Sequence, residues 1–165
     1  NTMSTTISIE RPILTKDELL VAWQGHRKLT RRVIEIFPEK DLFNFSIGGM
    51  RPFAELCREI IAVAAGSMQQ IVTGNIRPLE ECMPEVQEKA DILESWDQTT
   101  DIINTSWSQI QPERFREEIS LFGAYNMSVI GIIQYAIDNE IHHRGQGYVY
   151  LRALGIEPPF FWERF

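Results

Sequence analysis

Apolar residues recur at helical spacing in four long stretches of this 165-residue chain, with prolines and glycines between the stretches. The first stretch begins at Thr15, where a threonine followed three residues later by Glu18 predicts a capping box, and it ends at Pro38. The second has Pro52 in its first turn and continues to about Ile71. No segment alternates clearly enough to predict a pair of strands.

The third stretch runs from about Glu85 to Ile110, and the last runs from about Asn126 to Leu154 and closes at Gly155. Residues 73–84 contain one glycine and two prolines with little periodicity, so we expect a long crossover loop there. Residues 115–123 are expected to be irregular or briefly extended. The pattern therefore predicts an all-α four-helix bundle with a long crossover between helices two and three.

Length and composition indicate one ordinary globular domain, residues 15–165, preceded by an N-terminal arm, residues 1–14. A formal net charge of -7 disfavours a direct nucleic-acid partner. The chain has no apolar run long enough to span a membrane and no secretory signal at its start, so we expect a cytoplasmic protein without a membrane partner. Cys57 and Cys82 lack metal-ligand spacing and are expected to be reduced, structural residues.

The basic residues nearest to a cluster are His26, Arg27 and Lys28, followed by Arg31 and Arg32. They lie within the first helical stretch, and an acidic residue follows them. We interpret them as a solvent-exposed helix face, with His26 at the surface.

The last helix carries a narrow polar stripe on an otherwise largely apolar segment, so we expect the stripe to point into the bundle or into a cleft at its mouth. Asn139 and His143 lie one turn apart, which is the spacing of two metal ligands from one helix. The alternative is a core histidine hydrogen-bonded to its neighbours, with His142 wetted at the rim. Glu140 and Arg144 have the spacing of an intrahelical ion pair. The stripe comprises Ser128, Tyr135, Asn139, His143, Gln146 and Tyr150.

Two strings of residues carry a resemblance to a known family. One is HHRGQ at 142–146, continued by YLRALG at 150–155 and by Pro158 and Pro159; the other is SIGG at 46–49 followed by PFAEL at 52–56. Together they resemble the DinB family of DNA-damage-inducible-like proteins, from about Asp17 to Phe160. The resemblance implies an up-down-down-up bundle, a divalent metal held by three histidines, and a homodimer.

The resemblance also implies which positions of this chain would hold the metal. His143 matches the family's last histidine, whereas Asn139 and Glu59 stand where the other two histidines are expected. A site of Glu59, Asn139 and His143 would bind zinc, nickel or a similar divalent metal weakly or not at all. Glu59 is either a solvent-exposed flank of its helix or a partner of His143. Tyr135, Gln146 and Tyr150 are expected to line the pocket.

The predicted bundle and its altered metal position are consistent with two functions of different class. In the first, the metal site is weakened or lost, and the bundle binds a small molecule or acts as a homodimeric interaction module. In the second, the protein resembles the family's metal-dependent thiol S-transferases and isomerases, in which a metal lowers the pKa of a small-molecule thiol. The chain has no nucleophile elbow and no phosphate-binding glycine loop that would indicate other chemistry.

Overall fold

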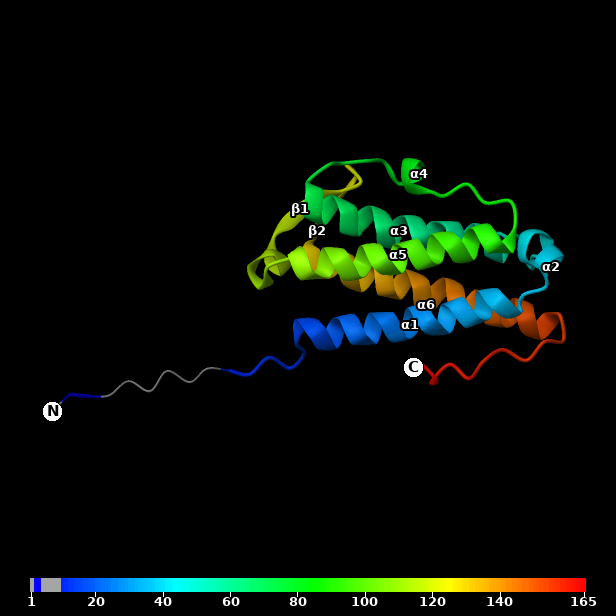
Figure 1. Cartoon of the computed structure of the whole chain (residues 1–165), viewed down its shortest axis with the longest axis horizontal. Coiled ribbons are helices and arrows are strands. Elements are labelled where there is room, and N and C mark those ends of the chain that lie inside the picture. Colours follow the sequence, from blue (N-terminus) through cyan, green and yellow to red (C-terminus); the bar gives the residue numbers. More distant parts are fainter. Residues whose placement is uncertain (1, 4–9) are drawn as a thin grey trace.

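The computed structural model describes residues 2–3 and 10–165, and its main feature is a bundle of four long helices. The predicted all-α four-helix bundle is therefore confirmed. Figure 1 shows that α1 and α6 run in one direction and that α3 and α5 run in the other, which is the up-down-down-up order. Residues 1 and 4–9 of the expected arm lie outside the described part. The long helices are α1 (Lys16–Ile36), α3 (Phe53–Thr73), α5 (Lys89–Gln109) and α6 (Val129–Ala153).

Hydrogen bonds at the helix starts explain where the helices begin. Thr15 Oγ1 accepts the Glu18 N–H at 3.1 Å, and the Glu18 carboxylate accepts the Thr15 N–H at 3.1 Å, so the predicted capping box is confirmed. Helix α5 begins four residues later than expected, because the Asp91 carboxylate accepts the N–H groups of Gln87 and Glu88 and ends the preceding loop there.

A short β-hairpin corrects the expectation that the chain has no strand pair. Strand β1 (Glu118–Leu121) pairs antiparallel with β2 (Tyr125–Ser128). Phe122 adopts a φ of 57° at the turn, which is unusual for a residue other than glycine. Its N–H donates to Gln70 Oε1 at 2.9 Å, and Gln70 Nε2 donates to the Ser120 carbonyl at 2.8 Å. Tertiary hydrogen bonds from α3 thus support the two strands. Each strand has only four residues, which is too short for a recognisable alternating pattern in the sequence.

The hairpin also moves the start of the last helix. Because β2 takes up residues 125–128, α6 begins at Val129 rather than at Asn126. Ser128 caps the helix, and its Oγ accepts the Gly131 N–H at 3.1 Å.

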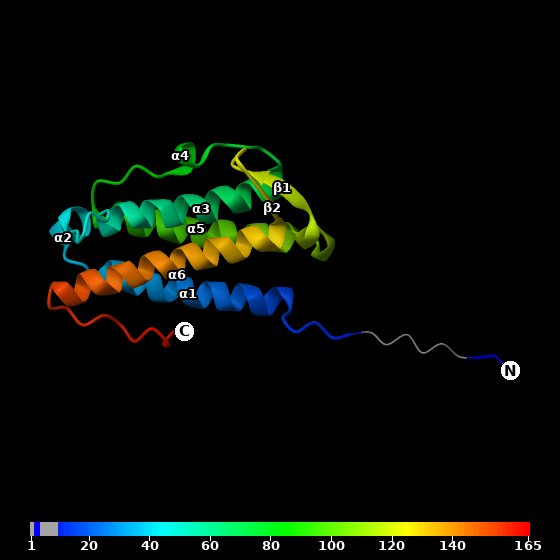
Figure 2. The same ribbon diagram turned by 180° about the vertical axis from the view of Figure 1, so that it is seen from behind.

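The crossover between α3 and α5 is confirmed, and it includes the short helix α4 (Leu79–Cys82). Figures 1 and 2 show this segment running along the outside of the bundle from the hairpin end back to the end where α2 (Glu39–Asn44) lies. The 3-10 helix η1 (Pro112–Arg116) connects α5 to the hairpin. None of the helices in the described residues is both long enough and apolar enough to cross a membrane.

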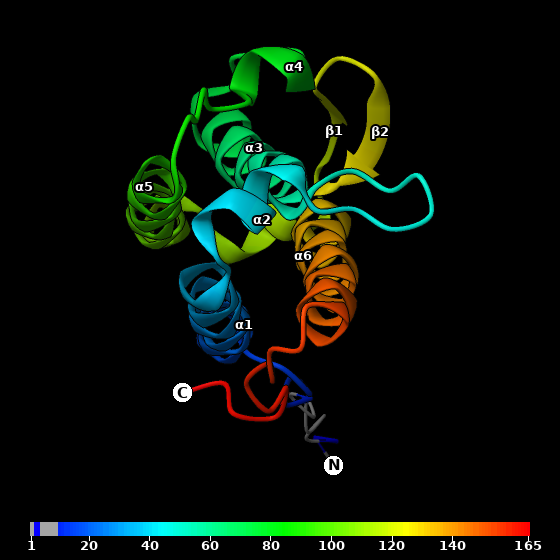
Figure 3. The same cartoon turned by 90° about the vertical axis from the view of Figure 1, so that its right-hand side faces the viewer.

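The core follows the length of the bundle, and Figure 3 shows the four long helices end-on. At the α2 end, Phe37 and Phe53 stack with ring centroids 4.7 Å apart. Helix α6 approaches this stack through Gly147, where an added Cβ would lie 2.6 Å from the Phe53 ring. Glycine is therefore required at 147 by packing between α3 and α6 rather than by backbone conformation.

A buried ionic network between α1 and α6 corrects the interpretation of the basic segment as a solvent-exposed face. Arg27 is only 1% exposed, donates to the Trp96 carbonyl at 2.9 Å and lies 4.2 Å above the Trp96 ring. Glu140 is fully buried and accepts a 2.7 Å hydrogen bond from Thr30. The predicted Glu140–Arg144 pair is present at 3.8 Å, and Arg27 lies at the same distance from the Glu140 carboxylate.

His26 is half-buried and not a surface residue. Its Nδ1 lies 3.2 Å from Arg144 Nη2, which makes Nδ1 an acceptor of a hydrogen bond from the guanidinium. Burial, with the nearby charges of Arg144 and Arg164, lowers the pKa of His26 to about 4. Arg164 lies in the C-terminal tail, which turns back along α1 (Figure 1) and approaches Gly25 so closely that a Cβ there would lie 2.7 Å from the Arg164 carbonyl oxygen.

Candidate functional site

The three residues expected at the metal position lie together between α3 and α6. His143 Nε2 makes a direct hydrogen bond to Glu59 Oε2, and Asn139 Nδ2 donates to the same oxygen at 3.0 Å. Asn139 and His143 are both buried, at the predicted inward-facing positions of α6. Glu59 belongs to the other side of the cluster, and its side chain is 20% exposed. The structure therefore pairs Glu59 with His143, which was one of the two alternatives for Glu59; the other was a solvent-exposed position on the flank of its helix.

The second ring nitrogen of His143 is also engaged. Its Nδ1 lies 2.6 Å from Gln146 Oε1, while the amide nitrogen of Gln146 donates to Met50 Sδ at 3.1 Å. Both imidazole nitrogens thus face side-chain oxygens of other residues. In this arrangement both ring nitrogens are engaged in hydrogen bonds within the protein.

Arg51, in the loop before α3, completes the cluster from the solvent side. Its guanidinium donates to Glu59 Oε1 at 3.2 Å, and its backbone carbonyl accepts a 2.8 Å hydrogen bond from the Tyr150 hydroxyl. Sequence reasoning missed Arg51 and Met50, because loop residues belong to no periodic face. The only signal that could have found them is their position directly before Pro52, at the entry to the helix that carries Glu59.

The charge state of Glu59 follows from these contacts. Partial burial by itself raises the pKa of the carboxyl, but hydrogen bonds from Asn139 and His143, together with the charges of His143 and Arg51, outweigh it. The pKa of Glu59 is therefore below its ordinary value. The cluster stabilises a carboxylate at neutral pH.

The remaining residues of the predicted stripe fall at different places. Tyr150 and Gln146 contact the cluster as described, and His142 is exposed at the rim. Tyr135 is 44% exposed and takes no part in these hydrogen bonds, so its place in a pocket lining stays a prediction. Two four-residue steps on a helix overshoot two full turns by about 80°, so Tyr135 lies to one side of His143 on α6.

One atom of the cluster has no partner among the described residues. Asn139 Oδ1 is buried and makes no hydrogen bond to any of them, because its amide nitrogen is turned toward Glu59. Within residues 2–3 and 10–165, no group of three or more histidine, cysteine or acidic side chains is placed to hold a metal ion. The candidate metal position therefore contains one imidazole, one carboxylate and one amide.

The two thiols lie away from this chemistry. Cys57 is buried and Cys82 is partly buried, and both are free, as expected. Burial raises the pKa of each thiol, with nearby Glu140 acting in the same direction on Cys57. Neither cysteine has the lowered pKa of a reactive nucleophile.

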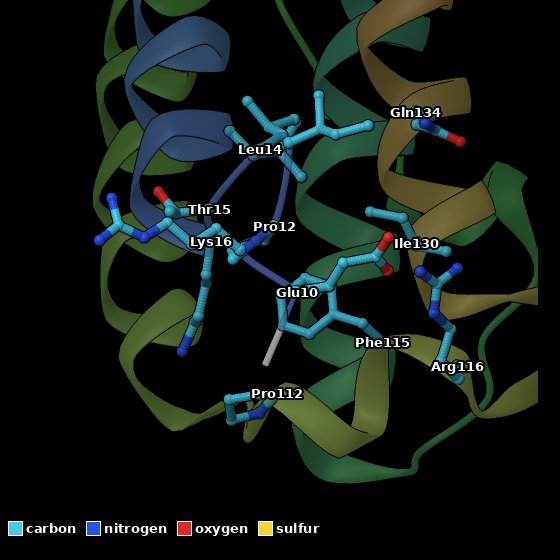
Figure 4. Close-up of a pocket in the computed structure, with 13 residues that line it drawn as sticks. Glu10, Pro12, Leu14, Thr15, Lys16, Pro112, Phe115, Arg116, Ile130 and Gln134 are labelled. Atoms are coloured by element: carbon cyan, nitrogen blue, oxygen red, sulfur yellow. The ribbon is translucent and has the colours of Figure 1, made fainter. Parts of the chain in front are cut away.

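A cavity of about 740 Å³ lies at the opposite end of the bundle from α2, among the arm, α1, η1 and α6 (Figure 4). None of the residues expected to line a pocket near His143, namely Tyr135, Gln146 and Tyr150, contributes to it. The hydrogen-bonded cluster and this cavity are separate features of the molecule.

Comparison with known proteins places the fold in context. The sequence matches the DinB family over residues 3–164. The uncharacterized protein YjoA of Bacillus subtilis (strain 168) is 27% identical over 154 residues, which cover 90% of this chain and 97% of the relative.

Two crystal structures have the same fold. The DinB-like protein YjoA from Bacillus subtilis superimposes with a TM-score of 0.73 at 23% identity, over 89% of this chain and 99% of that one. A DinB-like protein from Bacillus cereus ATCC 10987 gives a TM-score of 0.72 at 15% identity, over 87% of this chain and 95% of the other.

Proposed function

The chain belongs to the DinB family, and from this we propose that it is a DinB-like binding protein in which an internal hydrogen-bonded cluster replaces the resident metal. The observation that carries the proposal is the engagement of both His143 ring nitrogens by Glu59 and Gln146. A metal ion needs the lone pair of a neutral imidazole nitrogen. Here the hydrogen bond between His143 Nε2 and Glu59 occupies the place that the ion would need.

The donor set fits a resident transition metal poorly. His143 Nε2 and Glu59 Oε2 touch directly, so an ion could bind both only after displacing the proton and separating the two atoms. Asn139 turns its amide nitrogen, which cannot ligate a metal, toward the cluster. One imidazole and one carboxylate favour hard ions and bind them more weakly than three imidazoles bind zinc or nickel. We therefore expect weak, exchangeable binding of divalent metals.

A second candidate is a metal-dependent thiol S-transferase or isomerase that uses Glu59, Asn139 and His143 as ligands. The buried, unpartnered Oδ1 of Asn139 favours it, since a cation is one group that could satisfy a buried amide oxygen. For this function the Asn139 amide would have to turn over, and the Glu59–His143 contact would have to open.

Small-molecule binding and self-association are the activities that remain without a resident metal. Phe160, Phe161 and Trp162 form an exposed aromatic cluster in the C-terminal tail, each between 50% and 61% exposed. Exposed aromatic clusters are typical of protein interfaces, so we propose that the chain forms a homodimer. Sedimentation equilibrium tests this: a monomer at all concentrations, or a dimer unaffected by Trp162→Ser, would contradict it.

Nitrogen-15 NMR of the histidine side chains tests the metal-free cluster directly. The His143 resonances are assigned by their loss in His143→Gln. We expect the resonances of both ring nitrogens to stay unchanged when one equivalent of Zn²⁺ or Ni²⁺ is added. An Nε2 signal that shifts stoichiometrically to a metal-bound position would support the thiol-transferase candidate instead.

A further inference from the structure

The cavity at the arm end of the bundle has the size and lining of a small-molecule site. Its volume of about 740 Å³ falls within the range of about 300–1,000 Å³ that is usual for such sites. Leu14, Leu19, Phe115 and Ile130 supply apolar walls from four different segments (Figure 4). This site is independent of the Glu59–His143 cluster and does not rest on the function proposed above.

Two of these walls are fixed by the core. The Phe115 ring packs edge-on against Trp107 with centroids 5.6 Å apart, and Ile130 packs against the same core cluster. By contrast, Leu14 is 53% exposed beside the cavity, which leaves apolar surface for a ligand to cover. Burial of this surface by a hydrocarbon chain would stabilise the bound state.

The charges around the cavity differ in sign from the protein as a whole. Arg11, Lys16 and Arg116 line it with a single acidic residue, Glu10, although the chain carries a net charge of -7. Lys16 is already committed, since its Nζ donates to the Ile110 carbonyl at 2.6 Å. The Arg116 side chain is exposed, and its guanidinium makes no hydrogen bond to another described residue.

We propose that this cavity binds an amphiphile that carries a carboxylate and a medium-length hydrocarbon chain. Arg116 holds the carboxylate, because the guanidinium fork matches the two carboxylate oxygens. The hydrocarbon chain lies against Phe115 and Ile130. The ligand class is thus a free medium-chain fatty acid or a close chemical analogue.

Titration calorimetry of the full chain with decanoate, decan-1-ol and decyltrimethylammonium tests the proposal. We expect saturable one-to-one binding of decanoate below its micellar concentration, weaker binding of the alcohol and the weakest binding of the cation. Arg116→Gln weakens decanoate binding roughly tenfold and leaves the alcohol unchanged. Glu10→Gln tightens decanoate binding, because it removes the one acidic residue in the lining.

Matched variants separate the cavity from the general surface. Leu14→Asp weakens the binding of both decanoate and decan-1-ol. Val21→Asp, at a 71% exposed position on α1 outside the lining, leaves both affinities unchanged. Arg152→Gln, an exposed arginine far along α6, is the control for loss of positive charge. All of these positions are exposed enough to be changed without loss of the fold.

Three outcomes would overturn the proposal. Equal affinity for decanoate and decyltrimethylammonium would show that the charge of the ligand plays no part in binding. Unchanged decanoate affinity in the Arg116→Gln variant would show that Arg116 does not bind the carboxylate. Binding to phosphatidylglycerol vesicles without binding to monomeric decanoate would assign the surface to a lipid bilayer rather than to a free amphiphile.

Discussion

His143 on α6 and Glu59 on α3 are joined by a direct hydrogen bond between Nε2 and Oε2, at the position where the sequence resemblance predicts a metal site. The bond links two helices whose chain positions are 84 residues apart. The Gln146 side-chain oxygen lies 2.6 Å from the other ring nitrogen, Nδ1. A protein side chain thus satisfies each ring nitrogen of His143.

Restoring the two imidazoles tests whether the geometry of a metal site persists. We predict that Glu59→His combined with Asn139→His binds Zn²⁺ at least about 100-fold more tightly than the natural sequence, because imidazoles replace a carboxylate and an amide. Titration calorimetry measures the difference. The triple variant that adds His143→Ala is the control and should lose the gain. A folded double variant without improved affinity would contradict a preserved pocket.

Two glycines two residues apart on α6 should respond in opposite directions to alanine. Gly147→Ala places a Cβ 2.6 Å from the Phe53 ring, so we expect overpacking to cost about 1–3 kcal/mol. Gly145→Ala meets no atom within 4 Å and should stabilise the helix by about 0.5–1 kcal/mol. Urea unfolding gives both free energies. Equal effects of the two substitutions would show that α6 does not approach Phe53 as described.

The buried network between α1 and α6 should be far more sensitive than surface ion pairs. Glu140→Gln leaves the guanidinium groups of Arg27 and Arg144 buried without their carboxylate, and we expect a loss of about 3–5 kcal/mol in the free energy of unfolding. Glu35→Gln, which breaks the exposed pair with Arg31, is the matched control and should cost less than about 1 kcal/mol. Similar losses for both variants would argue against a buried network.

The free energy of unfolding should decrease as the pH is lowered through the range in which His26 takes up a proton. In the folded state the pKa of His26 is lowered from 6.5 to about 4, so the unfolded chain binds the proton more tightly. Protonation therefore favours unfolding as the pH falls from about 6.5 toward 4, and the stabilising contribution is fully present only above that window. Urea unfolding at a series of pH values measures it. In His26→Gln this part of the pH dependence should disappear, and an unchanged slope would contradict the assignment.

The four helices could be predicted from the sequence because their determinants are local. A capping box at Thr15, a proline before α3 and a glycine after α6 lie within a few residues of the ends that they define. The hairpin could not be predicted, because Gln70, some fifty residues earlier, supplies the hydrogen bonds that hold its turn. The same limitation applies to Arg27, whose burial depends on α5 and α6 rather than on its own helix.

In the candidate site, too, residues on one helix could be predicted from local spacing, whereas residues from other segments could not. Asn139 and His143 could be placed on one inward face from helical spacing alone, but their partner Glu59 followed only from the family resemblance. Tyr135 shares the polar stripe with them but makes none of the hydrogen bonds of the cluster, so its predicted role in the pocket remains a prediction. Arg51 and Met50 contact the cluster from a loop, and no periodic pattern identifies such residues.

Elemental analysis of the purified, dialysed protein tests whether the hydrogen-bonded cluster stands in place of a metal. We predict far less than one transition-metal ion per chain, because the hydrogen bond between His143 and Glu59 occupies the position of the ion. One equivalent of metal retained after dialysis in the natural sequence, and lost in His143→Ala, would contradict it.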